Sequence, residues 1–353
     1  MRLAYLYGMK YSFKNDYAEG AHPRILEALV RTNLQQQNGY GSDEFSQAAE
    51  QLILDLSKSA KSRAHFVSGG TQANIIVISA LLRPHESVIA ADTGHIFTNE
   101  SGAIEATGHK VHGVPTADGK LRAQDVQNVL DQHTNKPHQL KQKMVYISNA
   151  TEVGTFYTKS ELQELSDFCR RHGLHLFMDG ARLGNALTAE GSDLTLEHVA
   201  RLTDVYYLGG TKNGALLGEA IVINNTALQD EFNFHIKQKG GMLAKGRLLG
   251  IQFQELLRDH LYFDLARHAN AQAMRIKKAF QQAGCIFLSE TFTNQIFPVL
   301  THTQIEKLST HFDFYVWKKI NADQSAIRII TSWATTEESV EAFIREIGEL
   351  GHE

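Results

Sequence analysis

Short runs rich in β-forming residues alternate with helical patterns over most of this chain, and this alternation constrains the fold more than any other feature. Strands separated by helices are typical of βαβ units, in which successive strands pair in parallel. Strands are predicted at residues 65–67, 87–91, 144–148, 174–178, 204–208 and 219–223. The pattern therefore predicts an α/β fold with a mostly parallel sheet flanked by helices.

One unit shows how local signals support this prediction. The sequence Thr158-Lys159-Ser160-Glu161 is a capping box, in which the Thr and Glu side chains satisfy free N–H groups at a helix start. Apolar residues then recur at helical spacing until Gly173, which suits the left-handed position that ends a helix. The mostly apolar run at 174–178 that follows is expected of a strand covered on both faces.

After about residue 250 the pattern changes. A helical stretch at 248–283 leads into hairpin-like strands at 285–288, 295–299, 314–318 and 326–331, and a last helix is capped by Thr335 and Glu338. We expect an N-terminal arm and a large α/β domain over residues 1–250, and a smaller α+β domain over residues 251–353. The border is expected within a continuous helix, so that the two domains share an interface.

The charge balance excludes some classes of partner. The chain has 35 Lys and Arg against 39 Asp and Glu, a net charge of −4, so no overall basic field favours nucleic acid or an anionic membrane. Residues 1–16 contain no apolar signal-peptide core. Cys169 and Cys285 stand in no paired spacing and are interpreted as buried free thiols. These features predict a cytoplasmic protein.

A glycine-containing turn, Ser68-Gly69-Gly70-Thr71-Gln72, joins the strand at 65–67 to a helix expected at 73–82. Glycines let backbone N–H groups approach an anion, and a helix N-terminus carries partial positive charge, so a phosphate suits this place. An ordinary glycine turn is the structural alternative. The turn matches neither a P-loop nor G-x-G-x-x-G, which disfavours ATP and NAD.

Two more polar motifs follow predicted strands, where ligands of open α/β sheets bind. Met178-Asp179-Gly180-Ala181-Arg182 places a carboxylate that needs a partner, although a local Asp–Arg turn would also explain it. Gly209-Gly210-Thr211-Lys212-Asn213 places a lysine that can lose its proton when desolvated and act as a nucleophilic amine. A solvated loop lysine is the alternative reading.

A phosphate cradle, a carboxylate and an amine-bearing lysine on strand ends are what pyridoxal 5′-phosphate (PLP) needs. Their order along the chain resembles that in fold-type I PLP-dependent enzymes. The sequences of the motifs resemble the L-threonine aldolase and β-eliminating lyase family over about residues 15–341. The stretches that carry this resemblance are Gly70-Thr71-Gln72-Ala73-Asn74, His95-Ile96-Phe97, Met178-Asp179-Gly180-Ala181-Arg182-Leu183, Gly209-Gly210-Thr211-Lys212-Asn213-Gly214 and Ile327-Arg328.

The resemblance implies roles in cofactor binding. Lys212 would hold PLP through a Schiff base, and Asp179 would pair with the pyridine nitrogen. Gly70 and Thr71, with Gln72 as a further donor, would bind the phosphate. His95 would stack on the ring face.

The resemblance also implies roles toward the substrate. Arg328, helped by Arg182, would clamp the α-carboxylate, so that the Cα–Cβ bond is the one aimed for cleavage. A base would then take the β-hydroxyl proton in a retro-aldol step, and glycine and an aldehyde would leave.

Three places depart from the family pattern. Glu152 stands where family members often carry a His that contacts the substrate hydroxyl, and a carboxylate can also accept that proton. The family's N-terminal Arg-Ser-Asp-Thr is replaced by Lys14-Asn15-Asp16-Tyr17, with Asn15 expected near the substrate. Lys237 lies in a segment, residues 237–241, that resembles a loop reaching the neighbouring subunit's PLP phosphate, but the second basic residue of that loop does not align with this sequence.

The sequence thus predicts a PLP-dependent aldolase for β-hydroxy-α-amino acids such as threonine, allo-threonine or phenylserine. A homodimer or homotetramer with active sites near the subunit interface is expected. A PLP-dependent β-eliminating lyase or aminotransferase stays open as an alternative. A non-catalytic protein that binds PLP or an amino acid is a third.

Overall fold

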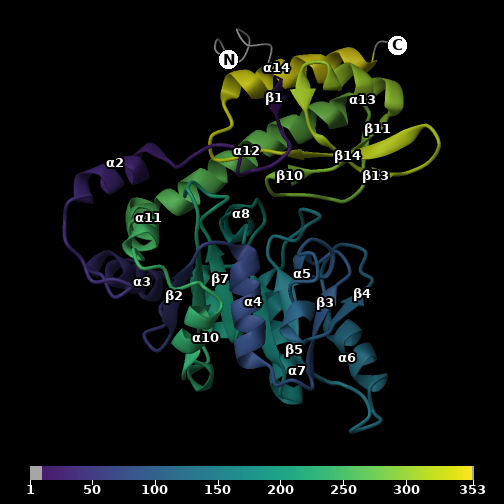
Figure 1. The fold of residues 1–353 in the computed structure, drawn as a ribbon. Helices are drawn as coiled ribbons and strands as arrows, with labels where there is room; N and C mark the ends of the chain where they lie inside the picture. The colour runs from purple at the N-terminus through teal and green to yellow at the C-terminus, as the bar shows by residue number, and fades with distance from the viewer. Residues whose placement is uncertain (1–9, 352–353) are drawn as a thin grey trace.

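The computed structural model describes residues 10–351, which form a large α/β part and a smaller C-terminal part stacked on it (Figure 1). The large part is built on a seven-stranded sheet in the order β2-β8-β7-β6-β5-β3-β4. Its strands are β2 (Arg63–Val67), β3 (Glu86–Ala91), β4 (Val111–Val114), β5 (Lys141–Ser148), β6 (His175–Asp179), β7 (Val205–Gly209) and β8 (Glu219–Ile223).

All neighbouring strands of this sheet are parallel except β8, which is antiparallel to both β2 and β7. The mostly parallel sheet and its six predicted strands are therefore confirmed. The strand β4 was not predicted, because Val111-His112-Gly113-Val114 has weak β-forming residues at its centre. It lies at the edge of the sheet, where a strand forms hydrogen bonds with one neighbouring strand, here β3.

Both faces of the sheet are covered, which explains its continuous apolar strands. Successive residues along β6, such as Leu176 and Phe177, point to opposite faces and belong to separate buried clusters. One face packs on α4 (Gly70–Leu81), α5 (His95–Thr98) and α10 (Phe232–Gln238). The other packs on α2 (Pro23–Thr32), α3 (Glu44–Ser57), α6 (Ala123–Asp131), α7 (Lys159–His172), α8 (Leu183–Thr188), α9 (Leu196–Leu202) and α11 (Arg247–Leu257).

The helix boundaries largely follow the predicted local signals. Thr158 caps α7, and its oxygen accepts from Glu161 N while Glu161 accepts in return, so the capping box is confirmed. Gly173 ends the helix with φ 63°, in the left-handed region. The helix α4 begins at Gly70, before the predicted start at residue 73, so Gly70, Thr71 and Gln72 form its first turn.

The smaller part has an antiparallel sheet in the order β10-β14-β11-β9, with β13 also paired to β14. Its elements are β9 (Ile286–Phe287), β10 (Gln295–Ile296), β11 (Pro298–Thr301), β12 (Phe312–Asp313), β13 (Tyr315–Lys319), β14 (Gln324–Ile330), α12 (Leu261–Gln282), α13 (His302–Ser309) and α14 (Glu337–Gly348). The arm strand β1 (Tyr11–Ser12) pairs in parallel with β12, and Phe13 packs in this part's core.

Two predictions about helices in this region are wrong. The expected continuous helix at 248–283 is broken, because Asp259 and His260 have φ 55° and 61° and separate α11 from α12. The cap of α14 is Thr336, which accepts from Ser339 N, whereas Thr335 accepts from Ser332 N one turn earlier. The division of the chain at residue 250 stays a proposal, and it falls within α11.

Two further observations concern membrane-spanning helices and thiols. Within residues 10–351, no helix is both long and apolar enough to cross a membrane. Cys169 is a buried free thiol as predicted, while Cys285 is also free and only half-buried.

Candidate active site

A cavity of about 540 Å³ opens at the edge of the large sheet where the parallel strands end. It lies between the two parts of the molecule, since Trp317 of β13 and Arg328 of β14 line it together with the strand ends. Among its lining residues are eight of the predicted site residues: Gly70, Thr71, His95, Glu152, Asp179, Arg182, Lys212 and Arg328. The structure thus brings together residues that are distant in the sequence.

The N-terminus of α4 forms one side of the cavity. Its cap residue Gly69 makes no side-chain capping bond, so the first-turn N–H groups face the cavity without a side-chain partner. A Cβ at Gly70 would lie 3.0 Å from the Tyr207 hydroxyl, which explains a glycine there. Backbone donors at a helix start are suited to an anion such as phosphate.

Asp179, the last residue of β6, is held by donors from three directions. Its Oδ1 accepts from Ala181 N at 3.0 Å, and its Oδ2 accepts from the Tyr146 hydroxyl at 2.5 Å and from Asn74 Nδ2 at 3.5 Å. Burial, together with the charge of Asp179, raises the pKa of Tyr146 well above its ordinary value, so Tyr146 stays a neutral donor. Asp179 is therefore a fixed carboxylate on the cavity wall.

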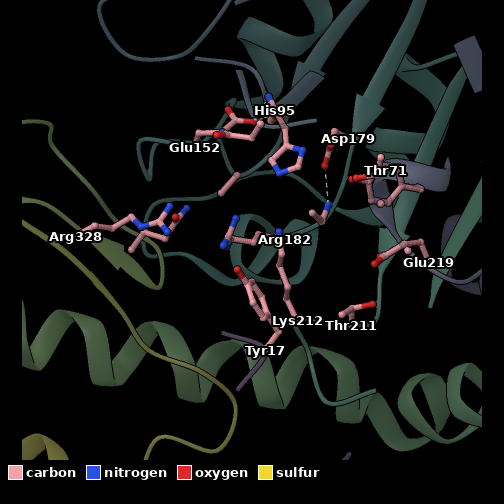
Figure 2. Close-up of a pocket in the computed structure, with 18 of the residues that line it drawn as sticks. Tyr17, Thr71, His95, Glu152, Asp179, Arg182, Thr211, Lys212, Glu219 and Arg328 are labelled. Carbon is pink, nitrogen blue, oxygen red and sulfur yellow. Dashed lines mark hydrogen bonds between the residues drawn. The ribbon is translucent and has the colours of Figure 1, made fainter. Parts of the chain in front are cut away.

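Lys212 lies in the turn after β7, and its side chain crosses the cavity beside Tyr17 (Figure 2). Burial and the neighbouring Arg182 charge lower the pKa of Lys212. A lowered pKa increases the fraction of neutral amine, which is the nucleophilic form. Lys212 therefore meets the requirement for an amine that bonds to a carbonyl compound.

Arg182 and Arg328 stand on the side of the cavity away from Thr71 (Figure 2). Arg182 is held by Asp16, with Nε at 2.7 Å from Oδ2 and Nη2 at 3.1 Å from Oδ1. Arg328 has a buried Nε without a hydrogen-bond partner among the described residues, and its guanidinium lies 4.5 Å from the Trp317 ring centroid. Burial lowers the pKa of Arg328, and a carboxylate ligand would satisfy its free N–H group.

Glu152 lies in the loop after β5, and one of its oxygens is free. Oε1 accepts from Ser148 Oγ at 2.6 Å and from His95 N at 2.9 Å. Oε2 is buried and has no hydrogen-bond partner within the described chain. Burial raises the pKa of Glu152, so that its carboxylate is a stronger base than usual.

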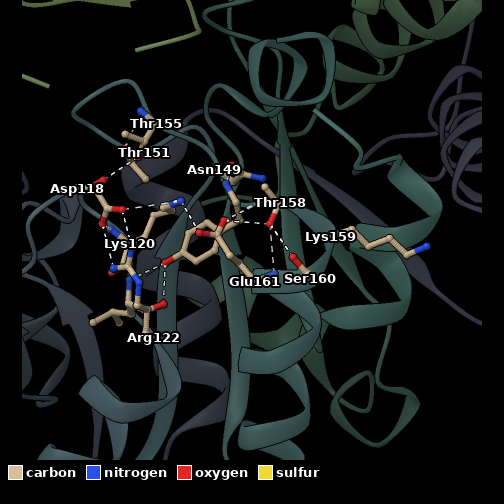
Figure 3. Close-up of polar contacts among 12 residues, drawn as sticks. Asp118, Lys120, Arg122, Asn149, Thr151, Thr155, Thr158, Lys159, Ser160 and Glu161 are labelled. Atoms are coloured by element: carbon tan, nitrogen blue, oxygen red, sulfur yellow. Dashed lines mark hydrogen bonds and ion pairs between the residues drawn. The ribbon is translucent and has the colours of Figure 1, made fainter. Parts of the chain in front are cut away.

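A polar network fixes the loop that carries Glu152 (Figure 3). The Thr155 hydroxyl donates to Asp118 O at 2.7 Å and lies 2.8 Å from the Thr151 hydroxyl. At the far end of the loop, Tyr157 N donates to Asn149 Oδ1 at 3.1 Å. These contacts hold the loop on both sides of Glu152.

His95 begins the short helix α5 and forms a pair with a buried acid. Its Nδ1 lies 2.9 Å from Glu100 Oε1, and this hydrogen bond raises the pKa of His95. Glu100 Oε1 also accepts from Asn74 Nδ2 at 2.7 Å. Glu100, itself held by Asn74, therefore fixes the orientation of the His95 ring.

Three predicted site residues are not among the described residues that line this cavity: Asn15, Gln72 and Lys237. The Gln72 side chain accepts from Ser68 N and donates to Lys239 O, so it stabilises the turn. Asn15 Oδ1 accepts from Tyr17 N, and the residue of the arm that reaches Arg182 is Asp16. Lys237 is placed over the Tyr40 ring, with its Nζ 4.4 Å from the centroid.

The sequence reasoning missed Asp16, Tyr146 and Glu219. Asp16 stood in a quoted motif, but no local signal pairs it with a residue far along the chain. Tyr146 is hidden inside a strand. Glu219 was a detectable exception, since it is a charged residue at the start of an apolar strand.

Comparisons with known proteins agree with this geometry. The model of the β-eliminating lyase family matches residues 16–303. A low specificity L-threonine aldolase from Pseudomonas aeruginosa is 32% identical over 344 residues, which cover 95% of this chain and 96% of the relative. The solved structure of a threonine aldolase from Leishmania major has 46% sequence identity and a TM-score of 0.95, covering 97% of this chain and 99% of that chain.

A more distant structure shares the fold alone. An aspartate aminotransferase variant from Thermus thermophilus has 13% identity and a TM-score of 0.71, covering 99% of this chain and 94% of that chain. The predicted fold class, that of fold-type I PLP-dependent enzymes with a large α/β part and a small C-terminal α+β part, is confirmed.

Proposed function

Because the chain belongs to the β-eliminating lyase family, we propose that it is a PLP-dependent aldolase of the threonine aldolase type, cleaving β-hydroxy-α-amino acids to glycine and an aldehyde. The observation that carries the proposal is that one cavity joins an anion-binding helix start, a fixed carboxylate and a buried lysine amine. The resemblance noted in the sequence is confirmed at the level of the family.

The donor set of the cavity fits PLP, which presents a phosphate, a ring nitrogen and an aldehyde. Gly70 and Thr71 at the start of α4 would hold the phosphate, and Asp179 would pair with the ring nitrogen. Lys212 would bond to the aldehyde carbon through its amine, and His95 would lie against the ring. When bound, PLP supplies an electron sink for bond cleavage at the substrate's Cα.

The other wall would bind the amino acid. Arg328 has a free N–H group for the α-carboxylate, and its stacking on Trp317 limits its movement. Arg182, already paired with Asp16, would contribute charge and a fixed position for the carboxylate. Fixing this carboxylate orients the Cα–Cβ bond for cleavage.

Glu152 would act as the base toward the β-hydroxyl through its free Oε2. Loss of that proton lets the Cα–Cβ bond break and the β-carbon leave as the carbonyl carbon of an aldehyde. The amino-acid part leaves as glycine after its Cα has gained a proton. His95 N–H and the Ser148 hydroxyl hold Oε1, so the two oxygens of Glu152 have different tasks.

We expect Glu152→Gln to lower kcat by about 10²- to 10⁴-fold with little change in KM, because the amide cannot take the hydroxyl proton. In the native enzyme, kcat/KM should fall as the pH drops through the raised pKa of Glu152, because the protonated carboxyl is not a base. Aldehyde release from L-threonine measures both effects. Glu105→Gln, at an exposed glutamate, is the control.

Exchange of the glycine α-proton with solvent deuterium separates this role from a structural one. Exchange involves no β-hydroxyl, so Glu152→Gln should retain it. Loss of exchange together with cleavage would show that Glu152 supports the site as a whole.

The cofactor and substrate class can be tested on the purified native protein. We expect close to one PLP per chain after extensive dialysis. We also expect glycine release from L-threonine, L-allo-threonine and phenylserine, and the order of the rates would define the substrate preference. A protein that retains no PLP and releases no glycine would refute the proposal.

We also propose a homodimer or homotetramer, supported by an exposed apolar row on and after α2. Leu26, Val30 and Leu34 are 45%, 79% and 92% exposed. Leu26 and Val30 are four residues apart and so lie along one side of the helix, and Leu34 follows in the turn after it. In such an assembly Lys237 would reach the partner's phosphate subsite, and the active sites would lie near the interface.

Light scattering should therefore give a multiple of the 39.4 kDa chain mass, and Val30→Asp should lower it, because burying an unpaired charge opposes association. The matched control is Ile286→Asp, an apolar residue 65% exposed on the smaller part. Equal masses for both variants and the native protein would exclude this row as the interface.

A further inference from the structure

Glu219 occupies a position that connects the two loops of the cofactor site. It is the first residue of β8, and it pairs with Val67 of β2 on one side and Gly209 of β7 on the other. Val67 leads directly into the turn before α4, and Gly209 leads directly into Thr211 and Lys212. The sheet register therefore places Glu219 between the proposed phosphate cradle and the lysine.

The side chain of Glu219 lines the cavity although the residue is only 4% exposed. Its Oε2 accepts from Gly210 N at 3.1 Å. Glu219, Thr211 and Thr71 lie on the same side of the cavity, opposite Arg328 (Figure 2). Glu219 thus stands at the end of the cavity where a phosphate would bind.

Within one chain, this end of the cavity is poor in positive charge. The Lys and Arg residues among the described lining are Arg182, Lys212 and Arg328, and the two arginines stand away from Thr71 (Figure 2). A phosphate monoester carries a charge of about −1.5 to −2 at neutral pH. An ionised carboxylate beside it would repel it, whereas a neutral carboxyl would donate a hydrogen bond.

The surroundings of Glu219 favour its neutral form. Burial raises its pKa to about 8, the nearby charge of Asp179 acts in the same direction, and the Thr211 hydrogen bond and the Lys212 charge oppose it. Tyr207 and Tyr262 also face Glu219, and burial raises the pKa of each, so both remain uncharged. The carboxyl is thus neutral below about pH 8 and ionises above it.

We propose that Glu219 is a cofactor-binding residue that keeps its proton at neutral pH and donates it in a hydrogen bond to the phosphate of the cofactor. The phosphate subsite then weakens when Glu219 ionises, because a donor is lost and a like charge appears. This inference rests on the proposed function, since it assigns a residue to the cofactor of that function.

Binding of pyridoxine 5′-phosphate tests the proposal without catalysis. This compound has the phosphate and the ring but no aldehyde, so it cannot bond covalently to Lys212. The full chain is first treated with hydroxylamine, which releases PLP as its oxime, and the oxime is removed by dialysis. The cofactor-free chain is then titrated at about pH 7 and about pH 9, a range above the second phosphate pKa of about 6. Pyridoxine, which lacks the phosphate, serves as the reference ligand.

We expect the Kd of pyridoxine 5′-phosphate to rise about tenfold or more between these pH values in the native protein. Glu219→Gln keeps an N–H donor at both pH values, so its Kd should change much less. Glu86→Gln, at another buried glutamate that starts a strand, should behave like the native protein. Because Lys212 titrates in all three proteins, only the difference between them reports Glu219.

Equal weakening in the native protein and Glu219→Gln would overturn the inference. Binding in neither protein at either pH would instead overturn the proposed cofactor, and the inference with it. If Glu219→Gln does not fold, infrared spectroscopy of the native complex decides. We expect a neutral carboxyl C=O band at about pH 7 that is lost at about pH 9, and its absence at the lower pH would contradict the proposal.

Discussion

Replacing Lys212 with Ala is expected to abolish covalent attachment of PLP and to lower aldolase turnover by about 10⁴-fold or more, because the nucleophilic amine that bonds to the cofactor is lost. Lys212 is the lysine that lines the cavity, and burial lowers its pKa toward the nucleophilic form. Attachment is measured by borohydride reduction followed by peptide mapping. The modified peptide should contain Lys212 in the native protein and be missing in the variant.

The control for this prediction is Lys159→Ala, at a lysine that extends away from the network in Figure 3. It should retain both attachment and turnover. Reduction that labels a different lysine in the native protein would contradict the assignment of Lys212. Full turnover in Lys212→Ala would exclude any chemical role for its amine.

Asp179→Asn is expected to lower kcat by about 10²-fold or more, because it removes a preorganised charge from the site. The amide keeps the shape of the carboxyl group. Its oxygen can accept from Ala181 N while its NH2 group donates to the Tyr146 hydroxyl, so the fold should persist. The negative charge that would pair with the ring nitrogen is lost. The measurement is steady-state kinetics on L-threonine, with PLP content determined on the same samples.

Asp313→Asn is the matched control. The Asp313 carboxylate lies 2.9 Å from the Lys14 amine, and Asp313 is not among the described residues that line the cavity. This variant should leave kcat unchanged. If Asp179→Asn kept full kcat at full PLP content, the ring-nitrogen role of Asp179 would be wrong.

The main site motifs could be predicted because each follows a parallel strand directly. The turn at Gly70, Asp179 and Lys212 can each be recognised from a position directly after a predicted strand. The topology of a parallel sheet then brings these strand ends together. Glu219 escaped this rule for a physical reason. β8 runs antiparallel to its neighbours, so the start of this strand, not its end, lies at the active edge.

Other features needed tertiary information. Asp16 lies in the N-terminal arm and pairs with Arg182, which is 166 positions further along the chain. No sequence motif predicts a pair between residues so far apart. The break between α11 and α12 occurs at Asp259 and His260, which adopt positive φ without a glycine or proline to signal it. The helix periodicity on both sides therefore looked continuous.

Glu152 lies between these cases. Its position after a strand was visible, but the sequence did not indicate that one oxygen is bound by His95 N and Ser148 while the other is free. That division of tasks depends on α5 and the network around Thr151 and Thr155, which come together only in the fold.

Product analysis tests the central claim most directly. Purified protein with PLP is incubated with L-threonine, and all products are quantified. We predict glycine and acetaldehyde in equal amounts. Formation of 2-oxobutyrate and ammonia would show β-elimination, conversion of the cofactor to its pyridoxamine form would show transamination, and either result would contradict an aldolase.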